Sequence, residues 1–266
     1  MSRISDVFQK CKEDGRKAFI PFLAAGDPDL ETTARALSAL DRAGADVIEL
    51  GIPFSDPIAD GPIIQASYQR ALSNGVSLEK TLAQLSELHL SAPLLLFTYL
   101  NPILQFGLEK LAREAAPKGL HGVLISDLTP EEAGNYRPSF LSHGIDTVFL
   151  AAPTTTAARL KKIIPCCSGF LYLIARTGVT GKQTVLSGDT QQQIELIRSH
   201  SSLPIAIGFG MRTSDDVRHA SSLADGVVVG SAIVEKLHQM VGQPAWEKKF
   251  EEYVVPFVEA THVKCK

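Results

Sequence analysis

Two carboxylates in one short stretch are the residues best suited to chemistry. Glu49 closes the apolar run Val47–Leu50, where an ordinary surface acid would be out of place. Burial disfavours the charged form of a carboxyl group, so the pKa of Glu49 should rise toward values useful in acid–base catalysis. Asp60 follows in a loop with several prolines, which would hold a second acid over the same site. The pair predicts proton transfer, whereas Asp56 in the same loop better fits a turn or a partner interface.

Three glycine-containing stretches predict a phosphate site. They are Gly178–Gly181 (GVTG), Ile207–Gly210 (IGFG) and Val229–Leu237, which opens a helix at Ser231. Glycine lets backbone N–H groups approach an anion closely, and a helix start adds a positive dipole end. Each stretch could instead be a simple turn. The chain has no P-loop lysine motif, so we expect a small phosphorylated metabolite rather than a nucleoside triphosphate.

Apolar side chains near the same strand ends could enclose a flat aromatic group. Any one of them could also be ordinary core. Together with two acids and a phosphate cradle, they predict a ligand with one aromatic end and one phosphate end. The side chains are Phe22, Ile64, Phe97, Leu124, Leu150 and Phe209.

Composition excludes several other classes of protein. The 266 residues are 45% hydrophobic with a net charge of −3, and no basic block suggests nucleic acid. The longest apolar runs have the length of strands, so we expect no membrane segment. The 4 cysteines lack framework spacing and fit reduced cytoplasmic thiols, while the 7 histidines are scattered singly. We therefore expect a cytoplasmic protein without a metal site.

Eight short apolar runs alternate with helical stretches along the chain. They are nearly continuous rather than alternating, which is typical of parallel strands covered on both faces. This pattern predicts a single-domain (β/α)8 TIM barrel over residues 1–266. A doubly wound open sheet is the alternative, but its glycine fingerprint after the first strand is missing. The runs are Ala18–Phe22, Val47–Leu50, Leu94–Thr98, Gly122–Ile125, Thr147–Leu150, Phe170–Ile174, Pro204–Ile207 and Gly226–Val229.

Three further helices are expected outside the eight units. One around Ile4–Lys12 would plug the bottom of the barrel, one around Ile63–Leu72 lies inside the second strand–helix connection, and an amphipathic one covers Trp246–Val258.

Polar residues at helix starts predict where several of the other helices begin. Asp29 should cap a helix that ends at Gly44, and Thr213 should open another. Thr129, followed by Pro130 and two glutamates, predicts a capped helix that runs to Gly144.

Taken together, these motifs resemble the α subunits of tryptophan synthase. The stretch ELGIPFSDPIADGP is the most specific, and the resemblance extends over most of the chain. The matching segments are Phe19–Asp29, Ala45–Ser67, Phe97–Ile103, Ser126–Glu132, Ala152–Thr156, Tyr172–Gly181, Ile207–Gly210 and Ala224–Val234. The resemblance implies retro-aldol cleavage of indole-3-glycerol phosphate to indole and glyceraldehyde 3-phosphate.

The resemblance also implies residue roles. Glu49 would shuttle protons at C3 of the indole ring and at the glycerol hydroxyl, Asp60 would stabilise the proton of the indole N–H, and Tyr172 would lie beside Glu49. Other matched positions surround the indole, bind the phosphate or belong to a loop that closes over substrate. They are Phe22, Ile64, Tyr99, Leu124, Thr180 and Phe209 for the substrate, and Gly181, Gly210, Gly230 and Ser231 for the phosphate.

The family's partner is a β subunit that carries pyridoxal phosphate and joins the α subunit in an α2β2 complex. The resemblance therefore implies no cofactor in this chain and a partner contact around Asp56. Two other functions share the fold: a free-standing indole-producing lyase, and a weakly catalytic subunit that mainly activates its partner. Another phosphate-binding barrel is a third alternative on fold alone.

Overall fold

The computed structural model describes residues 3–175, 177–180, 183–186, 188–208 and 210–262. Nine parallel strands form one sheet in the order β5-β4-β3-β2-β1-β11-β10-β7-β6. Since only Phe149 separates β5 from β6, these two are halves of one barrel strand, and the sheet is closed except at that break. The strands are β1 (Ala18–Ala24), β2 (Ile48–Gly51), β3 (Leu94–Thr98), β4 (Leu120–Ile125), β5 (Asp146–Val148), β6 (Leu150–Ala151), β7 (Leu171–Ile174), β10 (Ile205–Gly208) and β11 (Gly226–Val229). The predicted TIM barrel is confirmed, and the open sheet is wrong.

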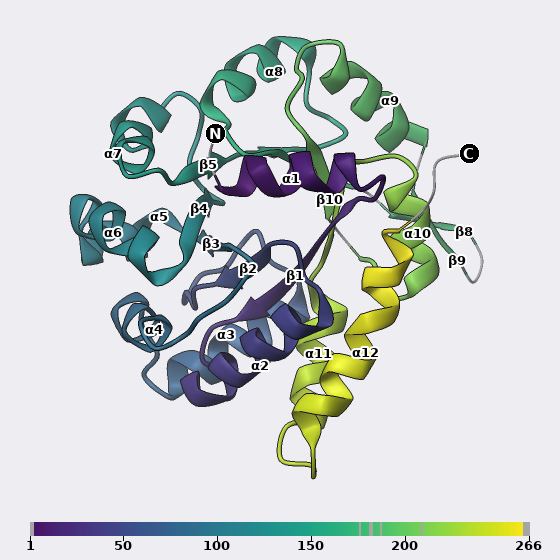
Figure 1. Cartoon of the computed structure of the whole chain (residues 1–266). Helices are drawn as coiled ribbons and strands as arrows, with labels where there is room; N and C mark the ends of the chain where they lie inside the picture. The colour runs from purple at the N-terminus through teal and green to yellow at the C-terminus, as the bar shows by residue number, and fades with distance from the viewer. Residues whose placement is uncertain (1–2, 176, 181–182, 187, 209, 263–266) are drawn as a thin grey trace.

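Helices surround the barrel, as Figure 1 shows. Short 3-10 turns cover Ala116–Lys118, Ala133–Asn135 and Ile164–Cys166. The outer helices are α2 (Leu30–Ala43), α3 (Pro62–Ser73), α4 (Leu78–Leu85), α5 (Leu100–Phe106), α6 (Leu108–Ala115), α7 (Arg137–Ser142), α8 (Ala157–Ile163), α9 (Gly188–Arg198), α10 (Ser214–Ser221), α11 (Ser231–Met240) and α12 (Trp246–Ala260).

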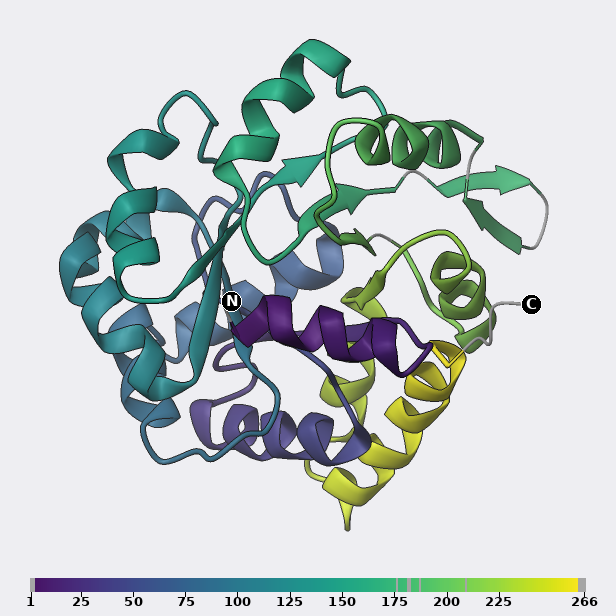
Figure 2. The ribbon, with the colours of Figure 1, turned by 45° about the horizontal axis from the view of Figure 1, so that its top comes forward.

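The N-terminal helix α1 (Arg3–Glu13) crosses one end of the barrel (Figure 2). Its buried residues Ile4 and Phe8 join the cluster of side chains that fills the barrel interior. A Cβ on Gly122, near the start of β4, would lie 2.5 Å from Cδ1 of Ile4, so glycine there makes room for the helix. The helix therefore closes the N-terminal ends of the strands, as predicted, and leaves chemistry to the opposite end.

The predicted helix starts are confirmed at two of three places. Asp29 accepts a hydrogen bond from the backbone N–H of Thr32 at the start of α2, and Gly44 ends that helix with φ of 99°. Thr213 and Asp216 form a reciprocal capping box at the start of α10. The helices predicted inside the second connection and at the C-terminus are α3 and α12.

The prediction at Thr129 is wrong, because α7 begins only at Arg137. The Thr129 hydroxyl donates to the Glu132 carboxylate (2.7 Å) instead of capping a helix, and a 3-10 turn follows at Ala133–Asn135. Pro138 explains the late start: it has no N–H to donate and its ring clashes with the carbonyl four residues before it. Pro138 instead occupies the first turn of α7, where a proline is tolerated, whereas in the interior of a helix from Pro130 it would be destabilising.

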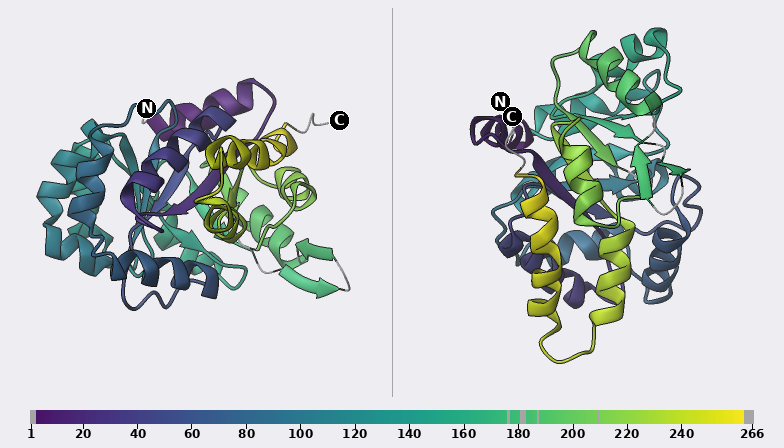
Figure 3. Two further views of the ribbon diagram at one scale, coloured as in Figure 1. Left: turned by 90° about the horizontal axis from the view of Figure 1, so that it is seen from below. Right: turned by 90° about the vertical axis from the view of Figure 1, so that its right-hand side faces the viewer.

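The segment that follows β7, the sixth barrel strand, contains a β-hairpin. Strands β8 (Thr177–Thr180) and β9 (Gln183–Leu186) pair antiparallel, with Thr177 opposite Leu186. Figure 3 shows the hairpin projecting from the side of the barrel.

Among the described residues, no helix is both long and apolar enough to cross a membrane.

Candidate active site

A cavity of about 280 Å³ opens at the carboxyl ends of the strands. Its wall combines two acids, a tyrosine, aromatic and aliphatic side chains, and several glycines, so it has both a polar and an apolar side. The lining residues are Phe22, Glu49, Ala59, Asp60, Gly61, Pro62, Ile64, Phe97, Leu150, Tyr172, Ile174, Gly208, Gly210, Val228, Gly230 and Ser231. This is the end of a TIM barrel at which reactive groups gather.

Glu49 lies in β2 between β1 and β3, opposite Phe22 and Leu95. Only 2% of its surface is exposed, and among the described residues its Oε1 atom has no hydrogen-bond partner. Burial, and secondarily the nearby charge of Asp60, raises the pKa of Glu49 to about 8. Glu49 is therefore mostly protonated at pH 7 and can act as a proton donor.

Asp60 is held by a neighbouring strand end as well as by its own loop. The Tyr99 hydroxyl donates to Oδ2 of Asp60 (2.7 Å) and accepts the backbone N–H of Ala59 (3.1 Å). The Phe54 ring stacks on Tyr99 with centroids 4.9 Å apart. Burial raises the pKa of Asp60, while the hydrogen bond from Tyr99 acts in the opposite direction. The second acid is thus fixed beside the first, with a hydroxyl that favours its ionised form.

Tyr172 comes from β7 on the other side of the cavity. A Cβ on Gly208 would lie 2.1 Å from the Tyr172 hydroxyl oxygen, so glycine at this position lets the phenol lie across β10. Burial raises the pKa of Tyr172 well above its usual value, and the charges of Glu49 and Asp60 add to the effect. The hydroxyl therefore stays protonated beside the two acids.

The apolar wall differs in part from the prediction. Phe22 and Phe97 meet edge to face with centroids 5.7 Å apart, and Ile64 lines the cavity with them. Leu124, in contrast, is fully buried in the barrel interior and is not among the lining residues. Tyr99 also lies behind the wall, where it contacts Asp60.

Three of the four predicted phosphate-binding residues lie together at one end of the cavity. Gly230 precedes α11, Ser231 is the first residue of that helix, and both line the cavity with Gly210. The first N–H groups of a helix have no partner within the helix and are available to an anion. Gly181 and Phe209 lie outside the described residues, while Thr180 is the last residue of β8.

Some residues near the site were missed by sequence reasoning. Ile174 and Val228 line the cavity, and Tyr68 packs with Phe22 and Ile64 just behind it. Tyr68 lies one helical turn after Ile64, so the i, i+4 spacing in the helix was a usable signal. Asp56 is exposed on the loop before Asp60 and does not line the cavity.

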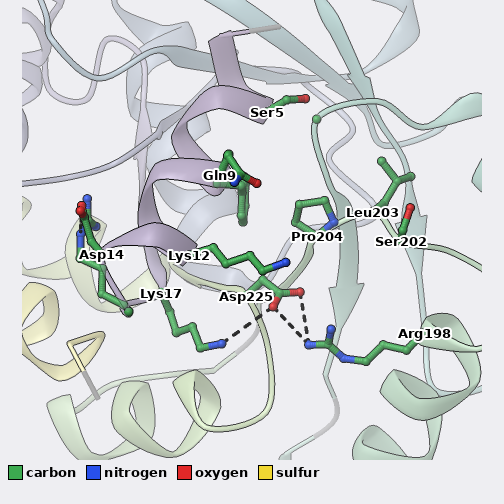
Figure 4. Close-up of a pocket in the computed structure, with 14 residues that line it drawn as sticks. Ser5, Gln9, Lys12, Asp14, Lys17, Arg198, Ser202, Leu203, Pro204 and Asp225 are labelled. Atoms are coloured by element: carbon green, nitrogen blue, oxygen red, sulfur yellow. Dashed lines mark hydrogen bonds and ion pairs between the residues drawn. The ribbon is translucent and has the colours of Figure 1, made fainter. Parts of the chain in front are cut away.

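A larger cavity, of about 760 Å³, lies at the N-terminal end of the barrel beside α1. Figure 4 shows Lys17 and Arg198 converging on Asp225 there, and their closest N–O distances are 3.9 and 3.2 Å. Asp225 also accepts the backbone N–H of Ile205. Asp225 is thus held by two cations and by the backbone of a neighbouring strand, whereas the smaller cavity contains the two carboxyl groups whose pKa values are raised. Among the described residues, no group of three or more His, Cys, Asp or Glu could hold a metal ion.

Comparisons with known proteins agree with this geometry. The family model described as "Tryptophan synthase alpha chain" matches residues 8–262. The tryptophan synthase alpha chain of Solibacter usitatus (strain Ellin6076) is 44% identical over 95% of this chain and 96% of its own length. That of Prochlorococcus marinus (strain MIT 9313) is 46% identical, over 88% and 86% of the two chains.

Solved structures resemble the fold over nearly the whole chain. Tryptophan synthase from Mycobacterium tuberculosis superposes with a TM-score of 0.90 at 31% identity, covering 99% of each chain. Tryptophan synthase subunit alpha from Legionella pneumophila str. Paris gives 0.88 at 32% identity, covering 98% of each chain. Sequence and structure together show that the chain belongs to the tryptophan synthase alpha chain family.

Proposed function

We propose that Glu49 and Asp60 carry the proton transfers by which this lyase cleaves indole-3-glycerol phosphate to indole and glyceraldehyde 3-phosphate. The main observation is that two carboxyl groups with raised pKa values meet in one half-apolar cavity. Perturbed acids that converge in a cavity are typical of acid–base sites.

The pKa values suggest a division of labour. Protonated Glu49 donates its proton to C3 of the indole ring, and Asp60 accepts or stabilises the proton of the ring N–H. The Glu49 carboxylate then takes the proton of the glycerol hydroxyl. As the C–C bond breaks, its electron pair returns to the ring and the hydroxyl carbon becomes the aldehyde. Tyr172 lies beside both acids and orients the reacting end of the substrate.

The rest of the cavity fits the rest of this substrate. Phe22, Phe97 and Ile64 supply an apolar wall for the indole. Gly210, Gly230 and the start of α11 at Ser231 supply backbone N–H groups for the phosphate. We keep Gly181, Thr180 and Phe209 as predicted substrate contacts. Leu124 and Tyr99 would act from behind the wall.

The family implies a β-subunit partner, and we propose an α2β2 complex in the cytoplasm in which the partner carries pyridoxal phosphate. Support comes from exposed apolar side chains on the active-site side: Ile58 is 87% exposed and Leu104 is 54% exposed. Ile58 is close in sequence to Asp56, which we propose as a partner contact. Exposed apolar residues of this size are suited to burial in an interface.

A steady-state indole assay tests the assignment of the acids. Glu49→Gln and Asp60→Asn should each lower kcat by a factor on the order of 10² or more, because each removes a proton-transfer group. Glu87→Gln, at an exposed acid far from the cavity, is the matched control and should keep parental activity. Parental rates in Glu49→Gln would show that the assignment is wrong. Adding a β subunit should accelerate indole release by the parent.

A further inference from the structure

Tyr68 of α3 lies directly behind the catalytic cavity. Its side chain is fully buried and packs with Phe22, Ile64 and Val234. A Cβ on Gly51 would lie 2.5 Å from the Tyr68 hydroxyl oxygen. Gly51 is two residues after Glu49 in β2, and alternate residues of a strand face the same side. The hydroxyl of Tyr68 therefore reaches the side of β2 from which the Glu49 carboxyl projects.

Two buried polar atoms in this region are unsatisfied. Among the described residues, neither the Tyr68 hydroxyl nor Oε1 of Glu49 has a hydrogen-bond partner. A buried hydroxyl without a partner disfavours folding, and phenylalanine would fill the same space without that cost. A polar group kept under these conditions is best explained by a state in which it forms a hydrogen bond.

The chemistry of Glu49 provides such a state. Neutral Glu49 is a weaker acceptor than its carboxylate, and once Glu49 has given its proton away a negative charge remains in an apolar wall. We infer that Tyr68 is a positioning residue whose hydroxyl donates a hydrogen bond to the Glu49 carboxylate formed during the reaction. This inference rests on the proposed role of Glu49. Glu49 and Gly51 are two residues apart, which is about 7 Å along a strand, and the side-chain bonds of Glu49 let its carboxyl turn toward the Tyr68 hydroxyl beside Gly51.

The Tyr68 hydroxyl keeps the proton that it would donate. Burial raises its pKa well above the usual value, and Asp60, Tyr99 and Glu49 raise it further by their charges. The phenol therefore stays protonated over the working pH range. The titratable groups that face Glu49 are Asp60 from the loop before α3, Tyr68 from α3, and Tyr172 from β7. Tyr172 lines the cavity and can meet substrate, whereas Tyr68 lies behind Phe22.

The test is Tyr68→Phe in the indole assay across pH. We expect kcat to fall by up to about tenfold with little change in KM, because the lost bond stabilises a charge that develops only in the reaction. The alkaline fall in kcat, which reports Glu49, should move up by about one pH unit, since a carboxylate without its donor is harder to form. The melting temperature should be equal or higher, because the removed hydroxyl had no partner.

Tyr253→Phe is the matched control, since it removes a phenol oxygen from α12, far from the cavity. An unchanged kcat and an unmoved alkaline limb in Tyr68→Phe would overturn the inference. So would a lower melting temperature with an unmoved limb, which indicates a structural role. In a Glu49→Gln background, Tyr68→Phe should have no further effect. If Glu49→Gln itself remained active, the proposed function would fail, which is a distinct outcome.

Discussion

Replacing Glu49 by glutamine should make the stability of the barrel less sensitive to alkaline pH. Glu49 titrates near an ordinary value of 4.5 when unfolded and at about 8 when folded. Its folded pKa is raised, so the stability associated with the neutral form is fully present below pH 4.5 and is lost as pH rises through 8. Glutamine has nearly the same shape and carries no charge at any pH, so the variant lacks this loss.

The size of the effect follows from the two pKa values. The shift is 8 − 4.5 = 3.5 units, and each unit corresponds to about 1.4 kcal/mol, which gives an upper bound of about 5 kcal/mol. Between pH 5 and pH 9 the parent should lose about 4 kcal/mol relative to Glu49→Gln, because part of the titration lies outside that range.

Urea denaturation at pH 5 and pH 9, followed by circular dichroism, measures this difference. The Glu87→Gln variant again serves as the control, since its carboxyl is exposed. If parent and Glu49→Gln differed in unfolding free energy by the same amount at both pH values, the reasoning that Glu49 is buried and neutral would be refuted. The assay needs no substrate, so it is independent of the catalytic proposal.

Three further predictions concern the surroundings of the site. Tyr99→Phe removes the 2.7 Å hydrogen bond to Asp60, so the pKa of Asp60 should rise. As a consequence, the acid limb of the pH profile of kcat should move to higher pH, and kcat at neutral pH should fall by about tenfold. An unmoved acid limb would contradict this. Gly230→Asp should raise KM for indole-3-glycerol phosphate by about 10- to 100-fold, because the new carboxylate repels the phosphate. The melting temperature should stay nearly unchanged, because the nearest atom to a Cβ at this position is in Phe22, at an ordinary contact distance of 3.7 Å. An unchanged KM would place the phosphate elsewhere. Ile4→Ala should lower the unfolding free energy by about 2–5 kcal/mol, because it leaves a cavity at a fully buried position. KM should not change, because Ile4 lies at the opposite end of the barrel from the cavity with the two acids. A loss below about 1 kcal/mol in urea denaturation would refute the packing role of α1.

The sequence by itself determined the architecture and singled out the two acids that line the cavity. Continuous apolar runs and helix caps are local patterns, and a parallel strand buried on both faces needs them whatever surrounds it. An acid at the end of such a run, as at Glu49, is visible without knowing its neighbours. The helix predicted from Thr129 was wrong although capping is a local pattern. The reason is Pro138, because a proline is tolerated in the first turn of a helix and disfavoured in its interior.

Only the tertiary structure decided which side chains meet. Three contacts depend on how strands and helices far apart in sequence are placed. Tyr99 donates a hydrogen bond to Asp60, Leu124 faces the barrel interior, and Tyr68 reaches β2. The same holds for the pKa of Glu49, since desolvation comes from every element packed around it. Periodicity tells which face of an element is buried, but not which residue of another element lies against it.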